Sequence, residues 1–199
     1  MEEEKREEPQ TEIRIRTIGH GTREIGEFLG ILREEKIQHV IDVRSVPRSR
    51  HNPQYDRETL AAALTASGIG YTHKASLGGF RKPSKDSPNG GWRNESFRGF
   101  ADYMLTGDYA DALKGLKEQS LREILVLMCA ETIPWRCHRS LIADSLTVDG
   151  YPVEEILGRS QGTVIKKIHR LTPWARVIDG RLHYPPSSKK EGFSFSDLH

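Results

Sequence analysis

Cysteine is scarce in this chain, which has only two among its 199 residues. Two cysteines are too few for a disulfide framework, and this indicates a reducing, cytoplasmic setting. Long apolar runs are also missing, since none approaches the roughly 20 residues that a membrane-spanning helix requires. The opening stretch MEEEKREEPQTE lacks the basic and apolar segments of a signal peptide. We therefore expect a cytoplasmic protein that does not enter a membrane.

A large excess of charge is missing as well. The formal net charge is +2, but residues 1–12 carry −4, so the remaining residues carry +6. This modestly basic remainder suits an anionic partner, either a small anionic substrate or a nucleic acid. It is weaker than the basic charge of dedicated DNA-binding domains. Nothing in the residues indicates an oligomeric state.

Strand-like and helix-like patterns alternate along the chain. Strands are expected at residues 13–19, 37–43, 69–73, 123–128 and 151–157. Helical spacing of apolar residues lies between most of them. This alternation predicts an α/β fold with a mostly parallel sheet and helices on both faces, in a Rossmann-like three-layer arrangement.

The domain boundaries follow from composition. We expect a single α/β domain over residues 13–185, flanked by a disordered acidic N-terminus (1–12) and a disordered tail (186–199). The Asp179-Gly180 pair, between two extended arms, predicts a C-terminal β-hairpin. Residues 76–97 are rich in Gly, Pro, Lys and Arg and are expected to form a long loop of the kind that often binds ligands.

The candidate site follows from the predicted topology. Ligands of parallel α/β sheets bind at the carboxyl ends of the strands. The segments that end the expected strands carry His20, Asp42, Arg44, Arg48, Arg81, Cys129 and Glu131. We expect these segments to meet at one edge of the sheet and to form a cationic cleft that contains a thiol. The glycines on both sides of His20 would let the backbone approach a ligand closely.

The stretch LVLMCAETIPWRCHRSLIADSL holds both cysteines, Cys129 and Cys137, eight residues apart. Four interpretations are open: a buried apolar cysteine, a thiolate activated by a helix N-terminus and arginines, a metal site, or a disulfide. Zinc is the weaker case because structural sites use four ligands and closer cysteines, and only His138, His20 or His51 could complete the set. No cofactor or metal is therefore expected.

Each candidate residue has a chemical role and a structural alternative. A catalytic site would use Cys129 as the nucleophile and His20 or His138 for proton transfer. Asp42, Glu131 and Cys137 would support it. The anion would be bound by Arg44, Arg48, Arg81, Arg136 and Arg139. The alternatives are that Arg136 and Arg139 pair with Glu131 or Asp42, and that His20 is an ordinary turn histidine.

The motifs TIGHGT (17–22), DVRSVPRSRHNPQ (42–54), LGGFR (77–81), FRGFADYM (97–104) and CAETIPWRCHRSLIADSL (129–146) resemble the family called domain of unknown function 488. The likeness extends over about residues 13–185. It implies a compact α/β domain with an ordered site built from these motifs, and it implies no activity. A fainter likeness to rhodanese and Cys-phosphatase domains concerns placement alone, because Pro134 interrupts the loop that those enzymes form after their cysteine.

Three functions are compatible with these residues. The favoured one is an enzyme, a thiol-dependent hydrolase or transferase, acting on a phosphate-bearing or nucleotide-like anion. The first alternative is a nucleic-acid-binding or DNA-repair-associated module without thiol chemistry. The second alternative is a metal or redox sensor that uses the two cysteines and a histidine.

Overall fold

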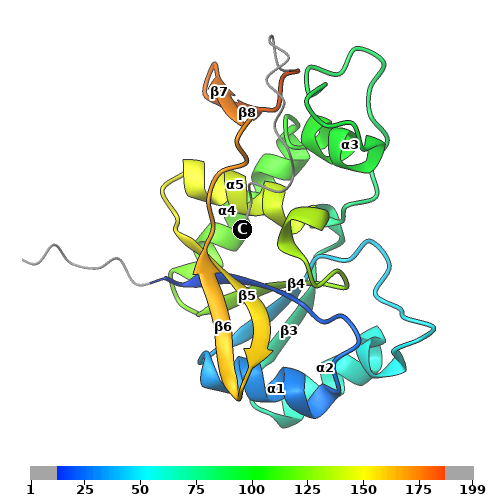
Figure 1. Ribbon diagram of the computed structural model, residues 1–199, viewed down its shortest axis with the longest axis vertical. Helices are drawn as coiled ribbons and strands as arrows, with labels where there is room; N and C mark the ends of the chain where they lie inside the picture. Colours follow the sequence, from blue (N-terminus) through cyan, green and yellow to red (C-terminus); the bar gives the residue numbers. More distant parts are fainter. Residues whose placement is uncertain (1–12, 187–199) are drawn as a thin grey trace, which may run out of the picture.

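The computed structural model describes residues 13–186 and contains one six-stranded sheet with helices on both faces (Figure 1). The sheet order is β3-β2-β4-β1-β5-β6, in which β1 to β5 are parallel and β6 runs antiparallel to β5. The strands are β1 (Ile15–Gly19), β2 (His39–Asp42), β3 (Gly70–His73), β4 (Leu125–Cys129), β5 (Val153–Ser160) and β6 (Thr163–Ile168). The predicted α/β class with a mostly parallel sheet is confirmed.

The helices form two layers, one on each side of the sheet (Figure 1). Helices α1 (Ile25–Glu34) and α2 (Arg57–Ala66) cover one face, and α3 (Glu95–Tyr103), α4 (Gly107–Ser120) and α5 (Arg139–Val148) cover the other. The short 3-10 turns are η1 (Pro53–Tyr55), η2 (Ala75–Leu77) and η3 (Pro134–Arg136).

Strand β4 shows why both layers are needed. Leu125 and Leu127 point to the α3–α5 side, whereas Val126 and Met128 point to the α1–α2 side. Successive strand residues face opposite sides, so an uninterrupted apolar strand must be covered twice. All four side chains are fully buried. No helix within residues 13–186 is long and apolar enough to cross a membrane.

The expected C-terminal hairpin is confirmed as β7 (Arg176–Ile178) and β8 (Arg181–His183). Asp179 and Gly180 between them have φ values of 49° and 72°. Two consecutive positive φ values are characteristic of the type I′ turn that suits the twist of paired strands. The expected disorder of residues 1–12 and, apart from Pro186, of the tail 186–199 lies outside the described residues.

A buried polar group, the carboxylate cluster (Asp144, Glu155, His169 and Tyr184), connects the segment after β6 and the residue after β8 to α5 and β5. The His169 ring lies between the two carboxylates, 2.8 Å from an oxygen of each. The Tyr184 hydroxyl donates to Asp144 at 2.8 Å. Burial alone would lower the pKa of His169, but the bonds to both carboxylates outweigh it and raise the pKa to about 9. The cluster is therefore a charged and fully paired structural element.

The long segment 76–97 is held against α3 rather than standing free. Asp102 of α3 accepts hydrogen bonds from Ser84, Ser87 and Asn89. Asn89 in turn accepts from the Tyr184 backbone N–H at 2.8 Å. The segment is thus a fixed wall between α3 and the C-terminal residues.

Candidate functional site

A cavity of about 510 Å³ opens at the carboxyl edge of the sheet. Its walls come from the segments after β2 and β4, from η3 with the start of α5, and from both ends of the 76–97 segment. The lining residues are Arg44, Ser45, Val46, Arg48, Ser49, Gly79, Phe80, Asn94, Ser96, Phe97, Cys129, Ala130, Glu131, Arg136, Cys137 and His138. A volume of this size is typical of sites for small molecules and cofactors.

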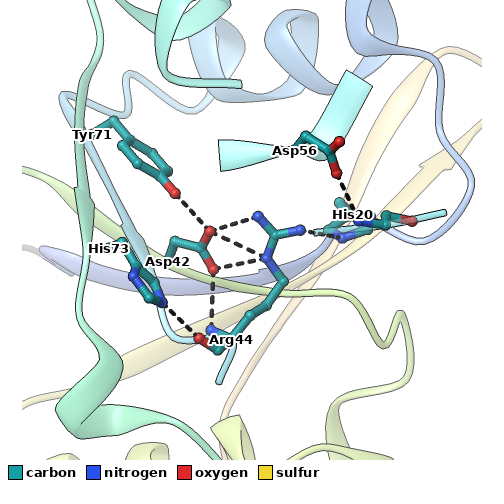
Figure 2. Close-up of polar contacts among 7 residues, drawn as sticks. His20, Asp42, Arg44, Asp56, Tyr71 and His73 are labelled. Atoms are coloured by element: carbon teal, nitrogen blue, oxygen red, sulfur yellow. Dashed lines mark hydrogen bonds and ion pairs between the residues drawn. The ribbon is translucent and has the colours of Figure 1, made fainter. Parts of the chain in front are cut away.

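Arg44 is held in place by the residue two positions before it. Its guanidinium donates to both oxygens of Asp42, with the shortest N–O distance at 2.6 Å, and the Tyr71 hydroxyl donates to the same carboxylate at 2.8 Å (Figure 2). His73 contacts the Arg44 carbonyl oxygen at 2.8 Å. Asp42 cancels much of the charge of Arg44, so this arginine offers fixed N–H donors rather than a free positive charge.

His20 lies beside the Arg44 guanidinium (Figure 2). It is not among the residues that line the cavity. Its ring stacks on Tyr55 with centroids 4.0 Å apart, and its Nδ1 contacts the Gly21 carbonyl oxygen at 2.8 Å. Its Nε2 is 3.4 Å from an Arg44 nitrogen. Burial lowers the pKa of His20 to about 4, against the bond to Gly21 and with the help of nearby Arg44. A neutral imidazole that accepts from Arg44 positions that arginine, which matches the turn-histidine alternative more closely than proton transfer.

The glycines beside His20 serve the chain itself, which differs from the expectation that they admit a ligand. A Cβ on Gly19 would lie 1.9 Å from the Glu131 carbonyl oxygen, and a Cβ on Gly21 would lie 2.4 Å from the Thr132 side chain. The loop after β4 therefore packs directly on the end of β1. This close approach brings the backbone of Glu131 next to Arg139.

The two cysteines meet at one side of the cavity, in a group that we name the thiol corner (Cys129, Cys137, His138 and Arg139). The cysteine sulfurs and a ring nitrogen of His138 all lie within 4.8 Å of one another. Cys129 ends β4, and η3 turns the chain back so that Cys137 returns to it. Both cysteines are free thiols.

The charge distribution between the two sulfurs differs from the sequence prediction. The hydrogen bond between the Cys129 and Cys137 side chains, together with burial, raises the pKa of Cys129 well above its ordinary value. The same bond lowers the pKa of Cys137 well below its ordinary value, and Arg139 adds to the effect. The thiolate expected at Cys129 is thus favoured at Cys137, which is only 4% exposed.

Arg139 is fully buried and does not line the cavity. Its Nε donates to the Cys137 sulfur at 3.3 Å, and its Nη2 donates to the Glu131 carbonyl oxygen. Its Nη1 has no partner among the described residues, and no carboxylate of residues 13–186 forms an ion pair with it. A buried guanidinium requires a nearby negative group. The sulfur of Cys137 is the group that the fold supplies.

Free cationic charge in the cavity comes from Arg48 and Arg136. Both are exposed, and neither forms an ion pair with a carboxylate in the described part of the chain. Glu131 also lines the cavity, and its carboxylate accepts from the Ile133 backbone N–H at 3.0 Å. Arg81 lies elsewhere, with its guanidinium 3.9 Å from the centre of the Tyr103 ring.

Several lining residues were not among the candidates from sequence. Phe80 and Phe97 add aromatic surface, and Ser45, Ser49, Asn94 and Ser96 add hydroxyl and amide groups. Tyr71 and Tyr55 lie behind the wall and fix Asp42 and His20. The only signal for them was their place in the segment after β2, in β3 or in the 76–97 loop.

These features place the protein in the class of parallel α/β domains that have a small-molecule cavity at the carboxyl edge of the sheet. A family model places the chain more closely. It matches residues 24–146 and is described as "Domain of unknown function DUF488". The chain belongs to this family, as its motifs indicated. The match is shorter than the expected range of 13–185. No curated protein and no solved structure matches the chain.

Proposed function

We propose that the cavity binds a small phosphate-bearing or nucleotide-like anion and that the protein acts on it as a hydrolase or transferase. The observation that carries the proposal is the set of arginines on the cavity wall. Arg48 and Arg136 provide uncompensated positive charge, and Arg44 provides N–H donors already held in position by Asp42. Phosphate groups are matched by such combinations of charge and paired donors.

The remaining walls suit the organic part of such a ligand. Phe80 and Phe97 offer surfaces on which a base or another ring can stack. The serine hydroxyls and the Asn94 amide can bind a sugar or its equivalent. The cavity has room for a nucleotide-sized molecule and is too small for more than a short part of a nucleic-acid strand.

The thiol corner supplies the reactive groups, because it is where the cavity has sulfur and imidazole together. A lone Cys129 nucleophile is the simplest form of the proposal. The hydrogen bond between Cys129 and Cys137 argues for the two sulfurs acting as a unit instead. Glu131, on the same wall, is the carboxylate available for proton transfer.

The arginine assignment is tested by calorimetric titration of the full chain with inorganic phosphate and with adenosine monophosphate. R48Q and R136Q should each weaken binding about tenfold or more, since a charge-assisted hydrogen bond contributes about 1.5–3 kcal/mol. R50Q is the matched control, because Arg50 is an exposed arginine of the same loop and does not line the cavity. Equal losses in all three variants, or no binding by the wild type, would overturn the assignment.

The chemical step is tested separately. Wild-type protein is incubated with a set of nucleoside phosphates, and the products are separated by chromatography. We expect at least one of these compounds to be converted. C129S should lose turnover while it retains phosphate binding. If single-stranded oligonucleotides bind with steep salt dependence and nucleotides do not, the nucleic-acid alternative replaces this proposal.

A further inference from the structure

We propose that Cys129, Cys137 and His138 form a binding site for one Zn²⁺ ion at the wall of the cavity. The three candidate ligand atoms come from three positions that the fold brings together, with all of them within 4.8 Å of one another. The inference stands on this cluster and does not require the phosphate ligand proposed above.

The spacing of the Cys137 and His138 ligand atoms fits a tetrahedral ion. Zinc binds sulfur at about 2.3 Å and imidazole nitrogen at about 2.0–2.1 Å, so two such ligands at a tetrahedral angle lie about 3.6–3.8 Å apart. The Cys137 sulfur and His138 Nδ1 are 3.7 Å apart. The eight-residue separation of the cysteines, which weighed against zinc in the sequence, is closed by η3.

His138 is already oriented as a metal ligand. Its Nε2 is 3.1 Å from the Val43 carbonyl oxygen and 3.0 Å from the Leu77 carbonyl oxygen. Two carbonyl acceptors require the proton to be on Nε2, which leaves the Nδ1 lone pair facing the sulfurs. Metal-binding histidines in proteins are commonly held in this way by a backbone carbonyl on the second nitrogen.

The surroundings of the sulfurs suit two thiolates bound to a cation. Arg139 donates its Nε–H to the Cys137 sulfur at 3.3 Å. Hydrogen bonds of this kind hold metal-bound thiolates in position.

The geometry also indicates the type of zinc site. All three ligands line the cavity, so the fourth position of the ion faces the space where a small molecule can enter. Three protein ligands with an open position are typical of catalytic zinc sites, whereas structural sites use four. Water or an oxygen of the bound anion would take that position. Imidazole and thiolate together favour zinc over magnesium or calcium.

The test uses the full chain, reduced and freed of metal with a chelator. Zn²⁺ is titrated in competition with a chromophoric chelator, and Co²⁺ is added in parallel as a spectroscopic probe. We expect one Zn²⁺ per chain and a sulfur-to-cobalt charge-transfer band. C129S and C137S should each weaken Zn²⁺ binding by more than about 100-fold, since even outer-shell changes cost 10–100-fold.

H51A is the matched control. His51 is an exposed histidine on the loop after β2 and outside the cluster, so its loss should leave Zn²⁺ affinity unchanged. Because serine at the buried Cys137 position could destabilise the chain, a second measurement uses the wild type alone. Zn²⁺ should protect both cysteines from a thiol reagent, and chelation should restore their reaction.

The outcomes separate this inference from the proposed function. Absence of stoichiometric zinc, zinc binding that C129S leaves intact, or a cobalt spectrum without sulfur ligation overturns the zinc site and leaves phosphate binding standing. R136Q should retain zinc affinity while phosphate binding falls. A chain that binds zinc but no phosphate overturns the proposed function alone.

Discussion

Two buried polar groups flank helix α5, and they differ in how completely their members are paired. In the carboxylate cluster, His169 contacts an acceptor with each ring nitrogen, and both oxygens of Asp144 accept hydrogen bonds. In the thiol corner, a nitrogen of Arg139 has no partner among the described residues and His138 presents a lone pair to sulfur. The first group is closed, and the second opens on a cavity.

This difference distinguishes a group that stabilises the fold from a group that can bind a ligand. Buried polar atoms in native proteins are nearly always satisfied, so a closed network needs no explanation beyond stability. Buried polar atoms without partners beside a cavity lower the free energy of unfolding, so stability does not explain them. We therefore expect changes in the carboxylate cluster to affect stability and changes in the thiol corner to affect binding.

The largest effect is expected for Asp144→Asn. This change removes one of the two carboxylates that flank His169 and weakens the bonds from Tyr184 and the Thr172 backbone, so it should lower the free energy of unfolding by about 3–5 kcal/mol. Asp149→Asn is the control, because Asp149 pairs with Lys117 at the surface and should cost less than about 1 kcal/mol. Urea denaturation measures both. Similar losses would remove the distinction drawn here.

The pH dependence of stability should show two histidines acting in opposite directions. His169 has a pKa raised to about 9, so it binds its proton more tightly in the folded state, and its contribution is lost as pH rises from about 6.5 to about 9. His20 has a pKa lowered to about 4, so its contribution is lost as pH falls from about 6.5 to about 4. Each pKa shift corresponds to a change of roughly 3 kcal/mol in the free energy of unfolding across its pH range.

Urea midpoints across this range should therefore be highest near neutral pH. H169Q should flatten the alkaline decline relative to the wild type, and H20N should flatten the acidic decline. An unchanged alkaline slope in H169Q would mean that the imidazole is not held charged between the two carboxylates.

A smaller effect on stability is expected for Gly79→Ala, which probes the thiol corner. A Cβ at this position would lie 2.5 Å from His138 Nδ1, so the ring must move, at a cost of about 1–3 kcal/mol. The displaced ring should also weaken Zn²⁺ binding. Gly26→Ala is the control, since no atom outside its helix lies near its Cβ, and it should be neutral or stabilising by up to about 1 kcal/mol. Zinc affinity retained in Gly79→Ala would contradict the assigned orientation of His138.

The fold was predictable where apolar periodicity was strong. Strands β1, β2, β4 and β5 were expected near their observed positions because most of their residues are buried. The hairpin was expected from its Asp179-Gly180 turn, although β7 is exposed. Strand β6 was missed because most of its side chains, including Lys166 and Lys167, are exposed at the edge of the sheet. Helix α3 was not assigned because it begins within the segment that composition marked as a loop.

The site was predictable to the level of the sheet edge. Parallel strands end on the same side, and this rule alone placed Arg44, Arg48, Cys129 and Glu131 at one cavity. The rule does not say where a side chain points. Arg139 turns inward because α5 begins with its buried face at that residue, and His20 turns back onto Tyr55. The contact between the two cysteines depends on η3, which no periodicity signals.

The place of β1 bears on how the family should be delimited. The matched interval of residues 24–146 leaves out Ile15–Gly19, yet this strand lies between β4 and β5 in the sheet. A chain trimmed to that interval would expose one side of β4, the strand that carries Cys129, as a bare hydrogen-bonding edge. It would also lose Ile15 and Ile18 from the two cores and His20 from beside Arg44. The smallest unit able to fold and carry this cavity is therefore larger than the stretch by which the family is detected.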